Sequence, residues 1–185
     1  MLNITKTIIG FVMDILETVV FVGSMFIVVY LFILTPNQVK GASMEPTFDS
    51  GDYILTSRVT YKFRRLERGD VVVFKSPKNH DIEYIKRIIG LPGETVEVGN
   101  GVVAVYNEEG GQVLAESNYL YPYVNTPGEA RITLGDDEYF VMGDNRPASS
   151  DSRRWGPLSK EYIVGRVFLR AWPFAALTKI ETPEY

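Results

Sequence analysis

The sequence predicts a mainly β protein, in which an N-terminal transmembrane helix is followed by an antiparallel β domain with a small cap subdomain. Residues 18–34 form a run of 17 residues without a charge, which is at the lower limit of the ~17 to 25 residues that span a bilayer. Beyond Thr35, short alternating segments rich in Val, Ile, Tyr and Phe are separated by Gly, Pro and Asn, as is typical of β-strands. We therefore expect an anchor over residues 1–35 and a β domain over residues 36–185.

The predicted transmembrane helix covers about residues 8–34, because further apolar residues precede the uncharged run. Asp14 and Glu17 interrupt this extension three residues apart, so they share one helix face and are expected to lie at the headgroups or against a partner. A cleavable signal peptide is the alternative, but it has a shorter apolar region, about 7 to 15 residues, followed by a small-x-small cleavage site. Lys40 disrupts the nearest such frame, which favours an anchor that is retained.

The β domain is predicted to contain eight strands and a cap insertion over about residues 95–138. Turns of the hairpin type are expected at Asn100-Gly101 and Glu109-Gly110-Gly111. Residues 108–128 are polar, aromatic and proline-bearing without a steady period, which predicts a loop or a small cap. The predicted strands are Tyr53–Ser57, Val71–Lys75, Ile82–Ile89, Thr95–Val98, Val102–Tyr106, Arg131–Leu134, Tyr139–Met142 and Ile163–Trp172.

Composition argues against several classes of function. A net charge of -4 and a pI near 5.1, with scattered basic residues, provide no basic field for nucleic acid. The chain has no cysteine and a single histidine, too few ligands for an ordinary zinc centre. We expect no nucleic-acid partner, no metal and no cofactor.

Ser43 is the first candidate for chemistry, because it lies in the turn-like segment Gly41-Ala42-Ser43-Met44-Glu45-Pro46, close after the anchor. A serine hydroxyl is a poor nucleophile until a neighbouring base removes its proton. The single histidine, His80, lies in a hydrophilic turn between two predicted strands, where exposure is expected. The sequence therefore argues against a Ser/His/Asp triad.

Lys86 is the better candidate for the base, because it lies within an apolar and aromatic strand, Tyr84-Ile85-Lys86-Arg87-Ile88-Ile89. Burial disfavours the ammonium form and can lower a lysine pKa by several units, which leaves a neutral amine able to accept a proton. Strand alternation alone, however, places Lys86 on the face opposite Ile85 and Arg87 and favours a solvated side chain. The residues by themselves leave both interpretations open.

A third segment, Gly143 to Arg153, is densely polar and follows the strand predicted at Tyr139–Met142. It could be an ordinary solvated loop, or a network of ion pairs and hydroxyl bonds held by a rigid strand.

Taken together, these segments resemble the bacterial type I signal peptidases, the membrane-anchored Ser/Lys endopeptidases that remove signal peptides from exported proteins. The resemblance covers nearly the whole chain, and motifs in this order are far more specific than any one of them. The anchor is followed by Gly41-Ala-Ser-Met-Glu-Pro-Thr47, Arg68-Gly-Asp-Val-Val-Val-Phe74, Tyr84-Ile-Lys-Arg-Ile-Ile-Gly-Leu-Pro-Gly-Glu94 and Gly143-Asp-Asn-Arg146 with Ser149 to Arg153.

The resemblance implies that Ser43 is the nucleophile and Lys86 the general base, with Ser149 hydrogen-bonded to the lysine amine. It also implies that the oxyanion is held by the Ser43 backbone N–H and a second donor near Gly41, where some relatives carry a serine hydroxyl. Pro147-Ala148 departs from the two polar residues of many relatives, although the spacing to Ser149 is kept. The residues implied in a structural polar network are Arg87, Asp144, Arg146, Asp151 and Arg153.

The resemblance further implies how substrates are recognised. Preproteins carrying signal peptides would bind as an extended strand, with small residues selected by shallow pockets whose candidate walls are Val39, Tyr84 and Ile85; core packing is the alternative role of these three. The partners implied are these preproteins and the lipid bilayer, with the secretion translocase nearby.

The location implied is the cytoplasmic membrane of a bacterium, with a single-pass anchor, a cytoplasmic N-terminus and an extracytoplasmic catalytic domain. Trp172-Pro173-Phe174 could enter the membrane interface or form a strand-terminal core cluster.

Other classes remain as alternatives. Self-cleaving repressors share a Ser-Met dipeptide and a β-rich domain but have no membrane anchor, and neither the Gly-x-Ser-x-Gly elbow nor the Ser-x-x-Lys motif is present. A catalytically silent anchored β domain, serving as a secretion accessory or binding module, is the alternative from a different class, since a fold does not prove turnover.

Overall fold

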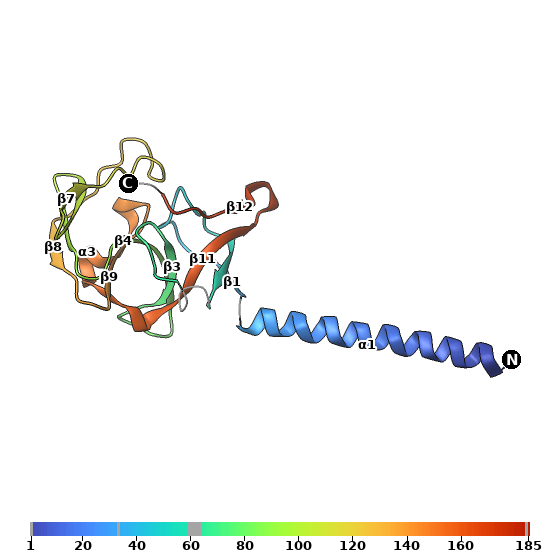
Figure 1. Ribbon diagram of the computed structural model, residues 1–185. Coiled ribbons are helices and arrows are strands. Elements are labelled where there is room, and N and C mark those ends of the chain that lie inside the picture. The colour runs from blue at the N-terminus through green and yellow to red at the C-terminus, as the bar shows by residue number, and fades with distance from the viewer. Residues whose placement is uncertain (1, 33, 59–63, 184) are drawn as a thin grey trace.

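One long helix, α1 (Leu2–Phe32), precedes the β domain and projects away from it (Figure 1). The computed structural model describes residues 2–32, 34–58, 64–183 and 185. Within these residues, the segment Lys6–Val28 is by length and composition able to cross a membrane. At ~1.5 Å per residue it is about 35 Å long, comparable with the ~30 Å hydrocarbon core. All of its side chains are exposed, as expected for a helix whose solvent is lipid.

The end of this helix differs from the prediction, because Leu34 belongs to a strand, β1 (Leu34–Gln38). Pro36 lies in this strand. Beyond the first turn of a helix, proline disfavours helical backbone at its own position. It also disfavours helical backbone at the residue before it. The residues after the anchor therefore form an edge strand paired with β2, where proline is tolerated.

The larger sheet is antiparallel and carries both ends of the β domain. Its strand order is β1-β2-β11-β3-β4-β9-β10, and β12 pairs with β11. Besides β1, its strands are β2 (Tyr53–Ser57), β3 (Val71–Lys75), β4 (Glu83–Gly90), β9 (Glu138–Met142), β10 (Leu158–Ser159), β11 (Ile163–Trp172) and β12 (Thr178–Lys179).

A second antiparallel sheet, in the order β7-β6-β5-β8, lies within the insertion predicted at residues 95–138. One strand, β7, falls in the segment expected to be irregular, because the turn at Gly110 lets it pair with β6. The strands are β5 (Thr95–Gly99), β6 (Val102–Asn107), β7 (Gly110–Val113) and β8 (Ala130–Thr133).

The two sheets share an apolar core, in which Ile89, Phe140 and Met142 of the larger sheet contact valines of the smaller one. Gly90 permits this close approach, because a Cβ atom there would lie 2.8 Å from Leu134 Cδ1 and closer still to Val96. The structure therefore confirms the predicted class: mostly β, antiparallel, with an N-terminal apolar helix.

The centre of the larger sheet is buried on both faces. On β3, Val71 and Val73 belong to one core cluster while Val72 and Phe74 belong to another. Strand β4 is likewise buried from Lys86 to Gly90. Helical turns complete the domain: η1 (Arg146–Ala148), α3 (Ser152–Trp155), η2 (Lys160–Tyr162) and η3 (Phe174–Ala176).

Candidate active site

Ser43 lies in the loop that joins β1 to β2, and two buried side chains hold this loop against the core. Met44 and Phe48 are fully buried, and the Phe48 backbone N–H donates to the Met44 carbonyl at 2.9 Å. Gly41 adopts φ +90°, a left-handed conformation that glycine adopts at little cost. The loop is thus anchored on one side, while Ser43 remains partly exposed.

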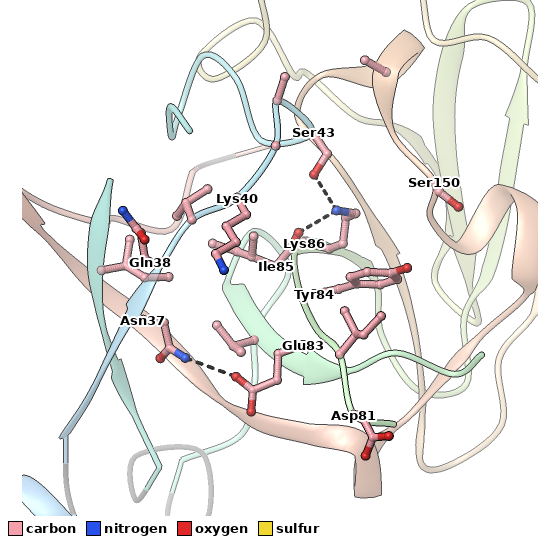
Figure 2. A pocket seen from close by; sticks show the side chains of 17 residues that line it. Asn37, Gln38, Lys40, Ser43, Asp81, Glu83, Tyr84, Ile85, Lys86 and Ser150 are labelled. Carbon is pink, nitrogen blue, oxygen red and sulfur yellow. Dashed lines mark hydrogen bonds between the residues drawn. The ribbon is translucent and has the colours of Figure 1, made fainter. Parts of the chain in front are cut away.

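Lys86 approaches Ser43 from β4. Its Nζ donates to Ser43 Oγ at 2.7 Å and to the Ile85 carbonyl oxygen at 2.8 Å (Figure 2). The lysine is only 4% exposed, which corrects the expectation from strand alternation that this side chain is solvated. Alternation predicts a wet face only where one face of the sheet is open, and here the Ser43 loop covers that face.

Burial lowers the pKa of Lys86 from 10.5 to about 8, because an ammonium ion loses hydration in this environment. The negative charges of Asp151 and Asp144 act in the opposite direction and raise this pKa. A substantial fraction of Lys86 is therefore neutral near pH 8, and the neutral amine is the form that can accept the Ser43 proton.

Arg87 points away from Lys86, as neighbours on a strand do, and forms a buried ion pair with Asp144. Its Nε donates to Asp144 Oδ1 at 2.9 Å and its Nη2 to Asp144 Oδ2 at 2.6 Å. Thr47 Oγ1 also donates to Asp144, at 2.5 Å. A bidentate pair of this kind fixes both partners in direction as well as in distance, so it ties β4 to the segment that follows β9.

Two further arginines, the buried Arg146 and the partly buried Arg153, hold the segment 143–153. Arg146 forms a bidentate pair with Glu116, with distances of 2.8 and 2.5 Å, and donates to Thr126 at 2.9 Å. Arg153 forms a second such pair with Asp151, at 2.8 and 2.7 Å. Burial raises the pKa of Asp151, but the hydrogen bonds and charge of Arg153 outweigh burial and lower it overall.

Sequence reasoning missed three partners of this network: Glu116, Thr126 and Thr47. Glu116 and Thr126 come from the irregular part of the cap, and Thr47 follows the Ser43 turn. Glu116 is 9% exposed although it lies in a polar segment, and no local pattern marks a glutamate as buried. The one available signal was the charge count of the implied network, since its three arginines, Arg87, Arg146 and Arg153, outnumber its two aspartates, Asp144 and Asp151.

Ser149 is buried, at 4% exposure, close to the Ser43 backbone. The hydrogen bonds that Lys86 Nζ makes within the described residues reach Ser43 and Ile85, so the implied bond from Lys86 to Ser149 stays a prediction. Ser149 packs against Gly143, where a Cβ atom would lie 2.7 Å from Ser149 Cβ and closer still to Ser149 Oγ and the Ser43 carbonyl oxygen.

We predict that Gly143→Ala lowers kcat by about tenfold to a hundredfold, because the added methyl group displaces Ser43 relative to Lys86 and small misplacements are costly in catalysis. Gly135→Ala is the matched control, since a Cβ atom there meets only Glu138, at 3.4 Å or beyond. Steady-state kinetics of both variants test this expectation, and equal kcat values would contradict it.

The family resemblance implies that backbone donors around Ser43 hold the oxyanion, and the structure shows which N–H groups are available there. The Ser43 N–H makes no hydrogen bond within the described part of the chain, so it is available to a ligand. The Gly41 N–H donates to Ser50 Oγ at 3.2 Å. Asn145, which sequence reasoning left out of the site, holds the loop through bonds to the Ala42 and Ser43 carbonyl oxygens at 3.0 and 3.1 Å.

A groove of about 550 Å³ begins at Ser43 and Lys86 and runs between β1 and β4. The predicted wall residues Val39, Tyr84 and Ile85 all line it. Strands β1 and β4 are separated by three strands in the order of the larger sheet, yet they face each other across the groove (Figure 2). The larger sheet is therefore curled. Among the described residues, no strand pairs with the edge of β1 away from β2, so an extended chain could add to it.

His80 is not part of this groove. Its side chain is exposed, and its ring packs against Tyr162 at 4.9 Å between centroids. Within the described ranges, no group of three or more His, Asp or Glu side chains is placed to hold a metal ion; catalysis without a metal or cofactor stays a prediction.

The fold and the groove define a class of protein. An apolar N-terminal helix is attached to a curled β domain, in which a serine hydroxyl and a buried amine lie at the end of an open groove. Comparison with known families is more specific. The model of the family described as signal peptidase, peptidase S26, matches residues 12–172. The chain therefore belongs to the signal peptidase family, and as a member of it this protein is a peptidase.

Two sequence relatives agree with this assignment. The chain is 34% identical to signal peptidase IB of Staphylococcus aureus strain COL, over 92% of this chain and 96% of that protein. It is 38% identical to probable signal peptidase I-2 of Synechocystis sp., over 77% of this chain and 65% of that protein. The crystal structure of a signal peptidase I from Enterococcus faecalis V583 is 30% identical, with a TM-score of 0.46, over 56% of this chain and 97% of that one.

Proposed function

We propose that this protein is a membrane-anchored serine endopeptidase that removes N-terminal signal peptides from exported preproteins, with Ser43 as nucleophile and Lys86 as general base. The observation that carries the proposal is the 2.7 Å hydrogen bond between Lys86 Nζ and Ser43 Oγ at the end of the groove, in a chain of the signal peptidase family. Asp144, Arg146, Asp151 and Arg153, with Arg87, hold the surrounding segments in place.

Acylation begins when the neutral Lys86 amine accepts the Ser43 proton as Oγ attacks the scissile carbonyl carbon. The Ser43 backbone N–H donates to the oxyanion that develops. Lys86, now an ammonium, gives its proton to the departing amine, and the signal peptide remains bound to Ser43 as an ester. Water then attacks the ester while Lys86 accepts a water proton, and Ser43 recovers a proton when the carboxylate product leaves.

Substrate selection follows from the shape of the groove. The precursor lies extended between β1 and β4, and Val39, Tyr84 and Ile85 limit the size of side chains near the cut. Small residues at the third and first positions before the cut are preferred, because larger ones would clash with these walls.

The location follows from the same function. Exported precursors are cut after translocation, so the β domain lies on the extracytoplasmic face of the cytoplasmic membrane and the start of α1 on the cytoplasmic side, with a single span and the translocase nearby. Trp172 and Phe174 are exposed, pack edge to face at 4.7 Å and precede the exposed Leu177. They are not a core cluster, and their exposure supports contact with the membrane interface, where aromatic rings are enriched.

The function is tested by incubating the full chain, in detergent or lipid vesicles, with an exported precursor and identifying the new N-terminus by mass spectrometry. We expect one cut that follows small residues at the third and first positions. The proposal fails if the precursor stays intact or is cut elsewhere.

The pH dependence of cleavage gives a separate prediction. Because the neutral amine is the active form, kcat/KM should rise about tenfold per pH unit below the pKa of Lys86 and level off above it. Burial sets that pKa at about 8, so the midpoint should lie well below the 10.5 of a solvated lysine. A profile that is flat from neutral to alkaline pH would argue against Lys86 as the base.

A further inference from the structure

The far end of the groove is crossed by a side-chain pair that the proposed chemistry does not use. Asn37 on β1 donates from Nδ2 to Glu83 Oε2 on β4 at 3.1 Å, so the pair joins the two walls (Figure 2). Glu83 is exposed, and both residues line the groove together with Asp81. An extended chain that runs from Ser43 and Lys86 along this groove must pass the Glu83 carboxylate.

The position of the anchor indicates which part of a precursor lies there. Strand β1 follows α1 and lies beside its end (Figure 1). The chain runs from there along β1 to the Ser43 loop, so Asn37 and its partner Glu83 are at the end of the groove nearer the anchor. A signal peptide has its apolar segment in the same membrane and its cut site at Ser43. The groove therefore holds the residues that precede the cut, a step that rests on the proposed function.

The strand spacing then gives the position along the precursor. Glu83 precedes Lys86 by three residues on β4, which is about 10 Å at ~3.3 Å per residue. An extended precursor has the same rise per residue. The side chain at the level of Glu83 therefore belongs to about the fourth residue before the cut.

The charges around this position are unevenly distributed. Within the part of the chain that the structure describes, the Glu83 carboxylate has one hydrogen-bond partner, the neutral Asn37. The second carboxylate at this end, Asp81, is also exposed. Lys40 lines the groove between Ser43 and this end (Figure 2). Lys75 is opposite Glu83 in the β3–β4 register, but no ion pair joins the two in the described residues.

We propose that Glu83, held across the groove by Asn37, is a specificity-determining residue that selects against acidic side chains, and in favour of basic ones, at about the fourth residue before the cut. A fixed charge facing the path of a ligand contributes more to discrimination than to affinity, because a like charge there is repelled while an opposite charge is attracted.

The test uses precursors that differ at one residue, with Lys, Gln or Glu placed in turn at the third to sixth positions before the cut. For the unmodified protein at low salt we expect kcat/KM to fall in the order Lys, Gln, Glu at one of these positions, with a Lys-to-Glu ratio of about five, the scale of exposed charge pairs. High salt should reduce the ratio toward about one, because it screens exposed charges.

Three variants assign the effect to Glu83. Glu83→Gln should bring the ratio close to one, and Glu83→Lys should reverse the order. Glu109→Gln is the matched control, because Glu109 is an exposed carboxylate in the turn between β6 and β7 and its loss should leave the ratio unchanged. Lys40→Gln should increase the ratio, since it removes the neighbouring positive charge.

A ratio near one in the unmodified protein, or a ratio that persists in Glu83→Gln, would overturn the inference while leaving the proposed function intact, as long as the Gln precursor is cut. Failure to cut any of the precursors would instead argue against the proposed function itself.

Discussion

Replacing Ser43 by alanine is expected to lower kcat by at least about 10⁴-fold, because residues that act as a catalytic unit lose nearly all of its rate when one is removed. Lys86→Ala should have an effect of similar size, since among the described residues Lys86 is the basic side chain that hydrogen-bonds to Ser43. The double variant should be no worse than the single ones, because the two side chains act in one step. Precursor cleavage under single-turnover conditions measures all three.

Lys86→Arg is the sharpest variant of this series. Arginine keeps a positive charge and a long side chain but does not lose its proton in proteins. If Lys86 is the base, the arginine variant should be as inactive as the alanine variant. If the lysine instead served only as a positive charge near Ser43, Lys86→Arg would keep much of the activity, and the proposed mechanism would be wrong. Thermal unfolding of each variant in detergent shows whether the fold is kept.

The second large effect is expected for Asp144→Ala, which should lower the free energy of unfolding by about 3 to 5 kcal/mol, the cost of leaving a buried charge without its partner. The side chains of Arg87 and Asp144 are 3% and 0% exposed, so water cannot replace the lost carboxylate. The measurement is urea or thermal unfolding of the full chain in detergent.

A surface pair provides the control for Asp144→Ala. Arg131 and Glu97 are 67% and 39% exposed at a similar distance of 2.5 Å, so Glu97→Ala should cost less than about 1 kcal/mol. Similar losses for the two variants would show that the Arg87–Asp144 pair is not protected from water.

Asp144→Ala should also lower the midpoint of the pH profile, because the Asp144 charge raises the pKa of Lys86.

The strands show how far local sequence information reaches. Tyr53–Ser57 and Val71–Lys75 have the bounds predicted from their alternation and flanking turns, because these segments are long and apolar enough for local pattern to decide them. Strand β1 was missed, because Leu34 to Gln38 contains Pro36 and Asn37 and has no alternation. It forms because β2 offers a pairing edge, and that is a tertiary condition.

The candidate site, like the strands, was predictable from local sequence only in part. Motif order placed Ser43 and Lys86 together, and both line the end of one groove. The partners of the arginines were not predictable as pairs, because Glu116 is separated from Arg146 by 30 residues and Thr47 from Asp144 by 97. Contacts at such separations depend on which strands are neighbours, and a single sequence does not contain that order in any local pattern.

The sequence by itself determined the apolar N-terminal helix and the antiparallel β class, and it singled out the residues proposed to carry the chemistry, because these depend on runs, alternation and motifs that are local in the chain. Tertiary structure alone decided that Lys86 is buried, that β1 and β4 face each other, and that Glu83 lines the groove between them. The physical reason is that burial, and with it the pKa of Lys86, is set by what covers a face of the sheet. Here the cover is the Ser43 loop, 43 residues away along the chain from the lysine.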